Sequence, residues 1–245
     1  MPSNLGLAHF WQQGDLVTHS VAILLLVLSI ASWSLTITRF FQQLRFNRAM
    51  DSVFTSFWEA DSIGVALEKI EREDKTGVFA RLAQAGVQAA QAHQRHAERG
   101  IGAGVNLSET VTRALRSQIV RSQVGIESGL TFLASVGATA PFIGLFGTVW
   151  GIYHALVALS GSSQVVLDKV AGPVGEALIM TAAGLFVAIP AVLAYNALTR
   201  ANRLIFAQLD GFAHDLHAYL TTGVHLPAVT GQAASARPVP VQAAA

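Results

Sequence analysis

Three stretches of this 245-residue chain contain no charged residue, and they dominate its pattern of polar and apolar positions. They are residues 16–38 (23 residues), 128–167 (40 residues) and 177–199 (23 residues). A helix rises about 1.5 Å per residue, so 23 residues reach roughly 34 Å. The hydrocarbon core of a bilayer is about 30 Å thick. The middle stretch is longer than one crossing needs and contains a turn-forming run at 160–163. The pattern predicts three membrane-spanning helices.

Basic residues outside these stretches predict the orientation. None precedes residue 16, whereas eleven lie between Arg39 and the second stretch. The loop between the second and third stretches has only Lys169. Because cytoplasmic loops carry the excess of Lys and Arg, we expect the N-terminus outside and the large loop inside. Residues 1–15 lack the basic region of a signal peptide, so we expect 16–38 to be a span that is not cleaved.

We therefore expect an all-α integral membrane protein with a periplasmic N-terminus and long cytoplasmic helical extensions. Its expected segments are the periplasmic N-terminus 1–15, transmembrane helix 16–38, cytoplasmic helical region 39–127, transmembrane helix 128–159, periplasmic loop 160–172, transmembrane helix 173–199, cytoplasmic helix extension 200–220 and disordered tail 221–245.

Helical periodicity continues beyond the spans. Apolar residues between Val53 and Ile70 recur at spacings of three and four. Residues 106–109 (NLSE) read as a capped helix start, from which the pattern runs into the second span without a break. The third helix is expected to open at Gly172-Pro173 and to continue past Arg203 to Tyr219. We expect these two inward extensions to pack with residues 50–90.

Composition and motifs narrow the function classes. The chain is 52% hydrophobic and only 13% charged, with net charge +1 and no cysteine. This excludes a mainly disordered chain, gives no basic face for nucleic acid and leaves no thiolate or disulfide site. Phosphate-loop, nucleophile-elbow and HExxH motifs are absent, so we expect no enzyme activity and no cofactor. The histidine pairs 93/96 and 214/217 have a spacing that could share a metal, but we interpret them as surface residues and expect no metal.

The second span carries a stripe of small residues at alternating spacings of four and three. In membranes such a stripe lets helix backbones approach closely. One interpretation is helix packing alone; the other is a face turned towards a pore or partner helix, with Thr148 exposed on it. The stripe consists of Gly137, Pro141, Gly144, Thr148, Gly151 and Ala155.

A similar face lies on the third span. It contains Thr181, Gly184, Ala188, Ala191 and Tyr195, close to Asn196. The two threonine hydroxyls could bind water or an ion, or each could donate a hydrogen bond to a carbonyl of its own helix.

Glu176 is the one acid that adjoins the apolar part of the second and third spans. An acid in a first helical turn is an ordinary capping feature. Acids within a membrane are costly, however, and favour a functional role such as a proton relay.

Two long runs carry a family resemblance. APFIGLFGTVWGIYHAL (Ala140 to Leu156) and AGPVGEALIMTAAGLFVAIPAVLAYNAL (Ala171 to Leu198) closely resemble the MotA/TolQ/ExbB proton-channel family, and within it the ExbB branch most. Together with the three-span topology, the resemblance covers nearly the whole chain except the tail.

The resemblance implies a homopentamer in the bacterial inner membrane. Its second and third spans line a pore that holds the transmembrane helices of ExbD, and TonB carries the energy to outer-membrane receptors for iron-siderophores and vitamin B12. Thr148 and Thr181 are implied to face the aspartate of ExbD, Glu176 to act in conduction, and Asn196 to match a further polar position. Two alternatives stay open, namely a TolQ-type subunit of the Tol-Pal motor and a non-conducting membrane scaffold.

Overall fold

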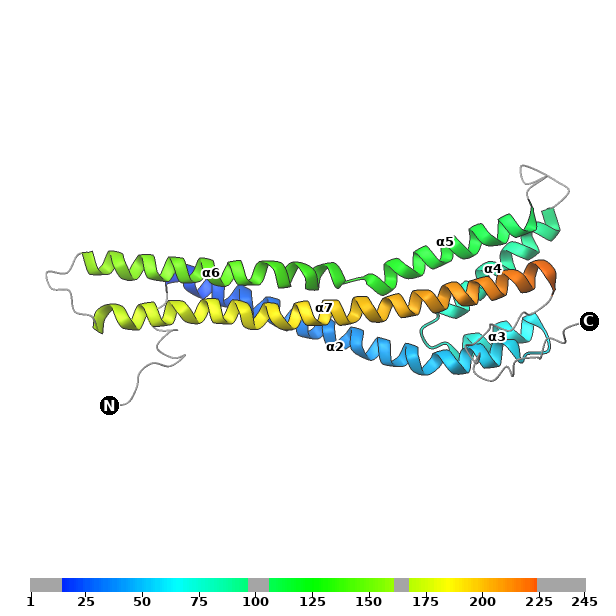
Figure 1. Ribbon diagram of the computed structural model, residues 1–245, viewed down its shortest axis with the longest axis horizontal. Helices are drawn as coiled ribbons and strands as arrows, with labels where there is room; N and C mark the ends of the chain where they lie inside the picture. Colours follow the sequence, from blue (N-terminus) through cyan, green and yellow to red (C-terminus); the bar gives the residue numbers. More distant parts are fainter. Residues whose placement is uncertain (1–14, 97–105, 161–167, 224–245) are drawn as a thin grey trace, which may run out of the picture. The chain divides into compact units, whose positions relative to one another are not determined.

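The computed structural model describes residues 15–96, 106–160 and 168–223, and every regular element in these ranges is an α-helix (Figure 1). The expected all-α class is therefore confirmed. The helices are α2 (Leu16–Trp58), α3 (Ile63–Glu73), α4 (Val78–His96), α5 (Leu107–Glu127), α6 (Leu130–Ser160) and α7 (Asp168–Thr222).

Three helical stretches are long and apolar enough to cross a membrane. They are Leu16–Trp58, Leu107–Val157 and Gly172–Thr222. Each exceeds the roughly 20 residues that a crossing requires, so each also continues beyond the apolar layer. The prediction of three spans is confirmed. The orientation of the N-terminus stays a prediction.

The chain forms two compact units, and α2, α5 and α7 each contribute to both. Of the described residues, the membrane unit comprises 15–50, 122–160 and 168–206, and the inner unit comprises 51–96, 106–121 and 207–223. The name of the inner unit follows the orientation predicted from the sequence. Each unit is described below by itself.

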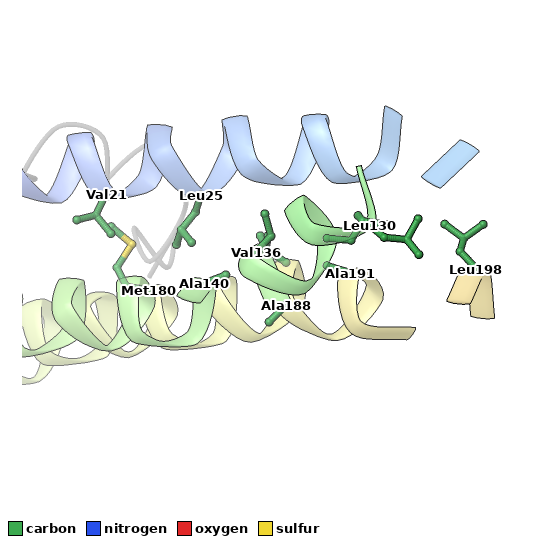
Figure 2. Packing of buried hydrophobic residues seen from close by; sticks show 11 residues of the cluster. Val21, Leu25, Leu130, Val136, Ala140, Met180, Ala188, Ala191 and Leu198 are labelled. Atoms are coloured by element: carbon green, nitrogen blue, oxygen red, sulfur yellow. The ribbon is translucent and has the colours of Figure 1, made fainter. Parts of the chain in front are cut away.

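The membrane unit has a core made from one face of each of α2, α6 and α7. Val21 and Leu25 of α2 point towards α6 and α7, and Met180 lies opposite Val21 (Figure 2). Small residues fill the positions between the helices, where Ala140 and Ala191 are almost fully buried. In lipid there is no hydrophobic driving force between helices. Close backbone packing of this kind stabilises their association instead.

The inner unit is built around aromatic rings. Phe212 of α7 packs against Phe57 of α2 at 5.1 Å between ring centroids and against Phe79 of α4 at 5.7 Å. Trp58 packs on Tyr219 at 5.9 Å. The extension of the third span therefore packs with the 50–90 region, as the apolar periodicity predicted.

A buried carboxylate fixes the start of α4. Asp74 is 4% exposed, and its oxygens accept hydrogen bonds from the backbone N–H groups of Thr76, Gly77, Phe79 and Ala80 at 2.7–3.0 Å. These donors have no partner inside the helix, so the carboxylate satisfies them as a cap does.

Two helix boundaries differ from the expectation. The helix expected to run without a break from residue 107 through the second span is interrupted at Ser128-Gly129, where Gly129 adopts φ of +85°. A side chain at position 129 would meet Leu35, and L-residues rarely adopt this φ. The third helix begins at Asp168, so Pro173 lies inside it and does not open it.

Some predictions fall outside the described residues. They concern segment 1–14, most of the loop expected at 160–172 and the tail from residue 224.

Candidate functional site

Helices α6 and α7 touch backbone to backbone where Gly144 meets Gly184. A Cβ on Gly144 would lie 2.5 Å from the carbonyl oxygen of Met180, and a Cβ on Gly184 would lie 2.6 Å from that of Ala140. Carbon atoms essentially never approach so closely, hence only glycine fits at either position.

The rest of the small-residue stripe follows the same contact. A Cβ on Gly151 would lie 2.9 Å from that of Ala177, and one on Gly137 would overlap Val192. Ala188 is buried and Pro141 is half-buried. Within one chain, the glycines of the stripe make the contacts of helix packing.

One turn from the glycine contact, two threonine hydroxyls meet across the helices. Thr148 Oγ1 lies 2.5 Å from Thr181 Oγ1. It also lies 3.0 Å from the carbonyl oxygen of Ala177 on α7 and 3.1 Å from that of Gly144 in its own helix. Thr148 therefore bonds a carbonyl of its own helix, as one interpretation expected. It also contacts a carbonyl and a hydroxyl of the facing helix, which that interpretation did not include.

The two hydroxyls differ in their surroundings. Thr148 has one hydroxyl hydrogen for three neighbouring oxygens, the two carbonyls and Thr181 Oγ1, and either threonine can be the donor of the bond between them. Thr148 is only 6% exposed, whereas Thr181 is half-buried. Thr181 is therefore the more accessible hydroxyl of the hydrogen-bonded pair.

Of the remaining residues singled out from the sequence, Asn196 lies apart from this pair. Asn196 is exposed on α7. It follows Thr181 by 15 residues, about 22 Å along a helix. The backbone of Glu176 belongs to α7, but its side chain is outside the part of the chain that the structure describes.

A second polar cluster joins the start of α2 to the last turns of α6, and sequence reasoning missed it. Asp15 caps α2 by accepting from the backbone N–H of Thr18 at 2.8 Å, and it accepts from the indole N–H of Trp150 at 2.6 Å. His154 Nε2 lies 3.9 Å from the same carboxylate. Burial raises the pKa of Asp15, but these hydrogen bonds and the nearby His154 outweigh it and lower the pKa to about 2.

The sequence signal for this cluster was only partial. An acid just before an apolar helix is a recognisable cap. Nothing in the spacing joins Trp150 or His154 to Asp15, because Trp150 lies 135 positions along the chain from it and His154 lies farther still.

Among the described residues, no cluster of three or more His, Cys, Asp or Glu side chains that could hold a metal ion occurs. His217 instead lies 3.0 Å from the hydroxyl of Ser108, at the start of α5.

Known proteins of similar sequence fall in one family. The model of the MotA/TolQ/ExbB proton channel family matches residues 74–210. The chain is 46% identical to the biopolymer transport protein ExbB of Xanthomonas campestris pv. campestris, over 84% of this chain and 83% of that protein. It is 41% identical to the ExbB of Neisseria meningitidis (86% and 94%) and 34% identical to the Tol-Pal system protein TolQ of Pseudomonas aeruginosa (86% and 90%).

The family match covers α4 to α7 for most of their length, including both threonines and the glycine contact. Together with three helices able to cross a bilayer, it shows that the chain is a multi-pass membrane protein of the MotA/TolQ/ExbB proton channel family.

Proposed function

We propose that this chain is the ExbB-type subunit of a proton-driven motor in the bacterial inner membrane. With ExbD it uses the proton-motive force to energise TonB-dependent transport of iron-siderophores and vitamin B12 across the outer membrane. The ExbB-named relatives from Xanthomonas and Neisseria support this role. The chain itself catalyses no covalent reaction.

The observation that carries the proposal is the hydroxyl pair between α6 and α7. Thr148 Oγ1 lies within hydrogen-bond distance of two carbonyls and of Thr181, and either threonine can donate to the other. When Thr148 donates to Thr181, Thr181 keeps its own hydrogen for an ionised carboxylate of a partner helix. When Thr181 donates to Thr148, Thr181 can accept from the protonated carboxyl group. A proton that crosses 100 mV releases about 2.3 kcal/mol, and the pair lowers the cost of the charged intermediate on the way.

The proposed assembly is a homopentamer whose second and third spans surround the ExbD helices. In the single chain, apolar residues such as Phe186, Ile189 and Leu193 of α7 stay exposed, which suits helices that meet further chains or lipid. Native mass spectrometry of the complex with ExbD should therefore give five copies of this chain.

The first test removes each hydroxyl while keeping its shape. In vesicles that contain this chain and ExbD, Thr148→Val and Thr181→Val should each lower proton flux by about tenfold, equivalent to about 1.4 kcal/mol in the barrier. Thr181→Ser, which keeps the hydroxyl, should retain most of the flux. Thr139→Val is the matched control, because Thr139 is exposed on α6 and bonds only the Ser135 carbonyl of its own helix. Native flux in both valine variants would refute the hydroxyl role.

Glu176 and Asn196 belong to the same proposed pathway. The effect of replacing Glu176 on proton flux distinguishes a proton channel from a non-conducting scaffold. Glu176→Gln should lower proton flux, whereas Glu127→Gln, at an exposed carboxylate at the end of α5, should not. A complex that conducts no protons in its native form would favour the scaffold.

The TolQ-type alternative is tested by complementation. Expressed in a strain that lacks both ExbB and TolQ, the chain should restore growth on ferric siderophore as sole iron source. Restoration of resistance to detergents without siderophore growth would favour the Tol-Pal motor instead.

A further inference from the structure

A small cavity lies within the membrane unit between α2 and α7. Its volume is about 30 Å³, and it is lined by Ser29, Ser32, Trp33 and Thr36 of α2 and by Val187, Pro190 and Ala191 of α7. A site needs on the order of 10–15 Å³ to hold one water molecule. The cavity has room for one water and is far too small for a ligand of several heavy atoms.

Ser32 supplies an unpaired polar group at this cavity. The residue is 4% exposed, and its hydroxyl oxygen has no hydrogen-bond partner in the structure. Burying a hydroxyl without a partner is unfavourable, and most of all at membrane depth, where no bulk water is present. Thr36 offers a further acceptor, because its hydroxyl already donates to the Ser32 carbonyl at 2.7 Å and keeps its lone pairs.

Pro190 supplies the complementary unpaired group on α7. Proline has no backbone N–H, so a proline inside a helix leaves the carbonyl four residues earlier without its donor. That carbonyl belongs to Phe186, which directly precedes Val187 and lies one turn before Pro190, both of which line the cavity. The cavity therefore has a hydroxyl without a partner on its α2 side and, on its α7 side, the proline that breaks the hydrogen-bond ladder.

We propose that one ordered water molecule occupies this cavity and bridges the two helices. It accepts a hydrogen bond from the Ser32 hydroxyl and donates to the Phe186 carbonyl, and its second hydrogen is available to Thr36. The water attaches the first span to α7 by a polar link within the apolar layer. The link is independent of the Thr148–Thr181 pair and of any proton pathway.

The direction in which Ser32→Ala changes the melting temperature distinguishes a cavity that holds water from an empty one. Ser32→Ala removes a hydroxyl that is either bridged or unpaired. We expect it to lower the melting temperature of the full chain in lipid nanodiscs by several degrees, since the water loses its donor. Ser34→Ala is the matched control, at an exposed serine of the same helix, and should leave the melting temperature unchanged. An unchanged or higher melting temperature for Ser32→Ala would mean that no water is bound.

A double-mutant cycle and a direct observation complete the test. In Pro190→Ala the restored N–H takes up the Phe186 carbonyl, so the additional effect of Ser32→Ala should shrink. An undiminished effect would contradict the bridge. If Pro190→Ala does not fold, a density map of the native chain at about 2 Å resolution decides alone. Compact density between Ser32 Oγ and the Phe186 oxygen is expected; an empty cavity, or elongated density from a lipid chain, would overturn the proposal.

Discussion

Asp15 shows how much one side chain does in this protein. Its carboxylate caps α2 and accepts from Trp150 of α6, and its pKa is lowered from the ordinary value of 3.8 to about 2. A depressed pKa means that the folded state prefers the ionised form. The stabilisation is therefore complete above about pH 4, and it is lost as the pH falls through 2.

Asp15→Asn tests this coupling. Asparagine can still cap the helix, but it lacks the charge and one of the two acceptor oxygens. We expect about 1 kcal/mol lower stability at pH 7, and the difference from the native protein should narrow between pH 5 and pH 2. Thermal denaturation in micelles across this range measures it, with Asp210→Asn, at an exposed aspartate of α7, as control. A difference that does not change with pH would contradict the assigned pKa.

The residues of the candidate site were predictable to different degrees. Thr148 and Thr181 stand out in sequence because each is a hydroxyl among small residues at helical spacing. Their meeting at 2.5 Å is not predictable, since spacing fixes the face of each helix but not the register between two helices. Asp15 and Trp150 could not be paired for the same reason.

At the scale of elements, the contact between α6 and α7 at Gly144 and Gly184 leaves no room for an added side chain. The Cβ added by Gly184→Ala would lie 2.6 Å from the Ala140 carbonyl, a backbone atom that cannot turn away. Overpacking of this kind costs about 1–3 kcal/mol. Gly211→Ala in the same helix has no atom within 4 Å of its new Cβ and should stabilise by about 0.5–1 kcal/mol.

Thermal denaturation of the two variants checks this prediction. The opposite signs matter more than the sizes, because both substitutions add the same methyl group to the same helix. A stabilising Gly184→Ala would mean that α6 and α7 lie farther apart than the structure has them.

Helix existence and some helix boundaries were predictable, since α2 begins at Leu16 and α5 begins at Leu107, within the expected start at 106–109. Two other boundaries were missed. Long uncharged stretches identify spans because the bilayer fixes their length. The interruption at Gly129 was missed because glycine is frequent in membrane helices, so its presence alone does not indicate a positive φ. The position of Pro173 inside α7 was also missed. Proline is typical of the first turn of a helix but is not confined to it.

For the molecule as a whole, the orientation in the membrane is the main open prediction. The absence of cysteine in the sequence makes a clean test possible, because any cysteine introduced is the only one. With the N-terminus outside, Ser160→Cys at the end of α6 should react with a membrane-impermeant maleimide in intact spheroplasts. Ser117→Cys in α5 should react only after lysis. The reverse pattern would invert the topology.

The two glycines at the crossing of α6 and α7 also limit how this protein can change over time. Glycine is the smallest residue, so every amino-acid replacement at position 144 or 184 adds volume. Mutation can therefore widen this crossing but can never tighten it. Any change that brings the two helices closer together therefore has to begin at the residues around the glycines.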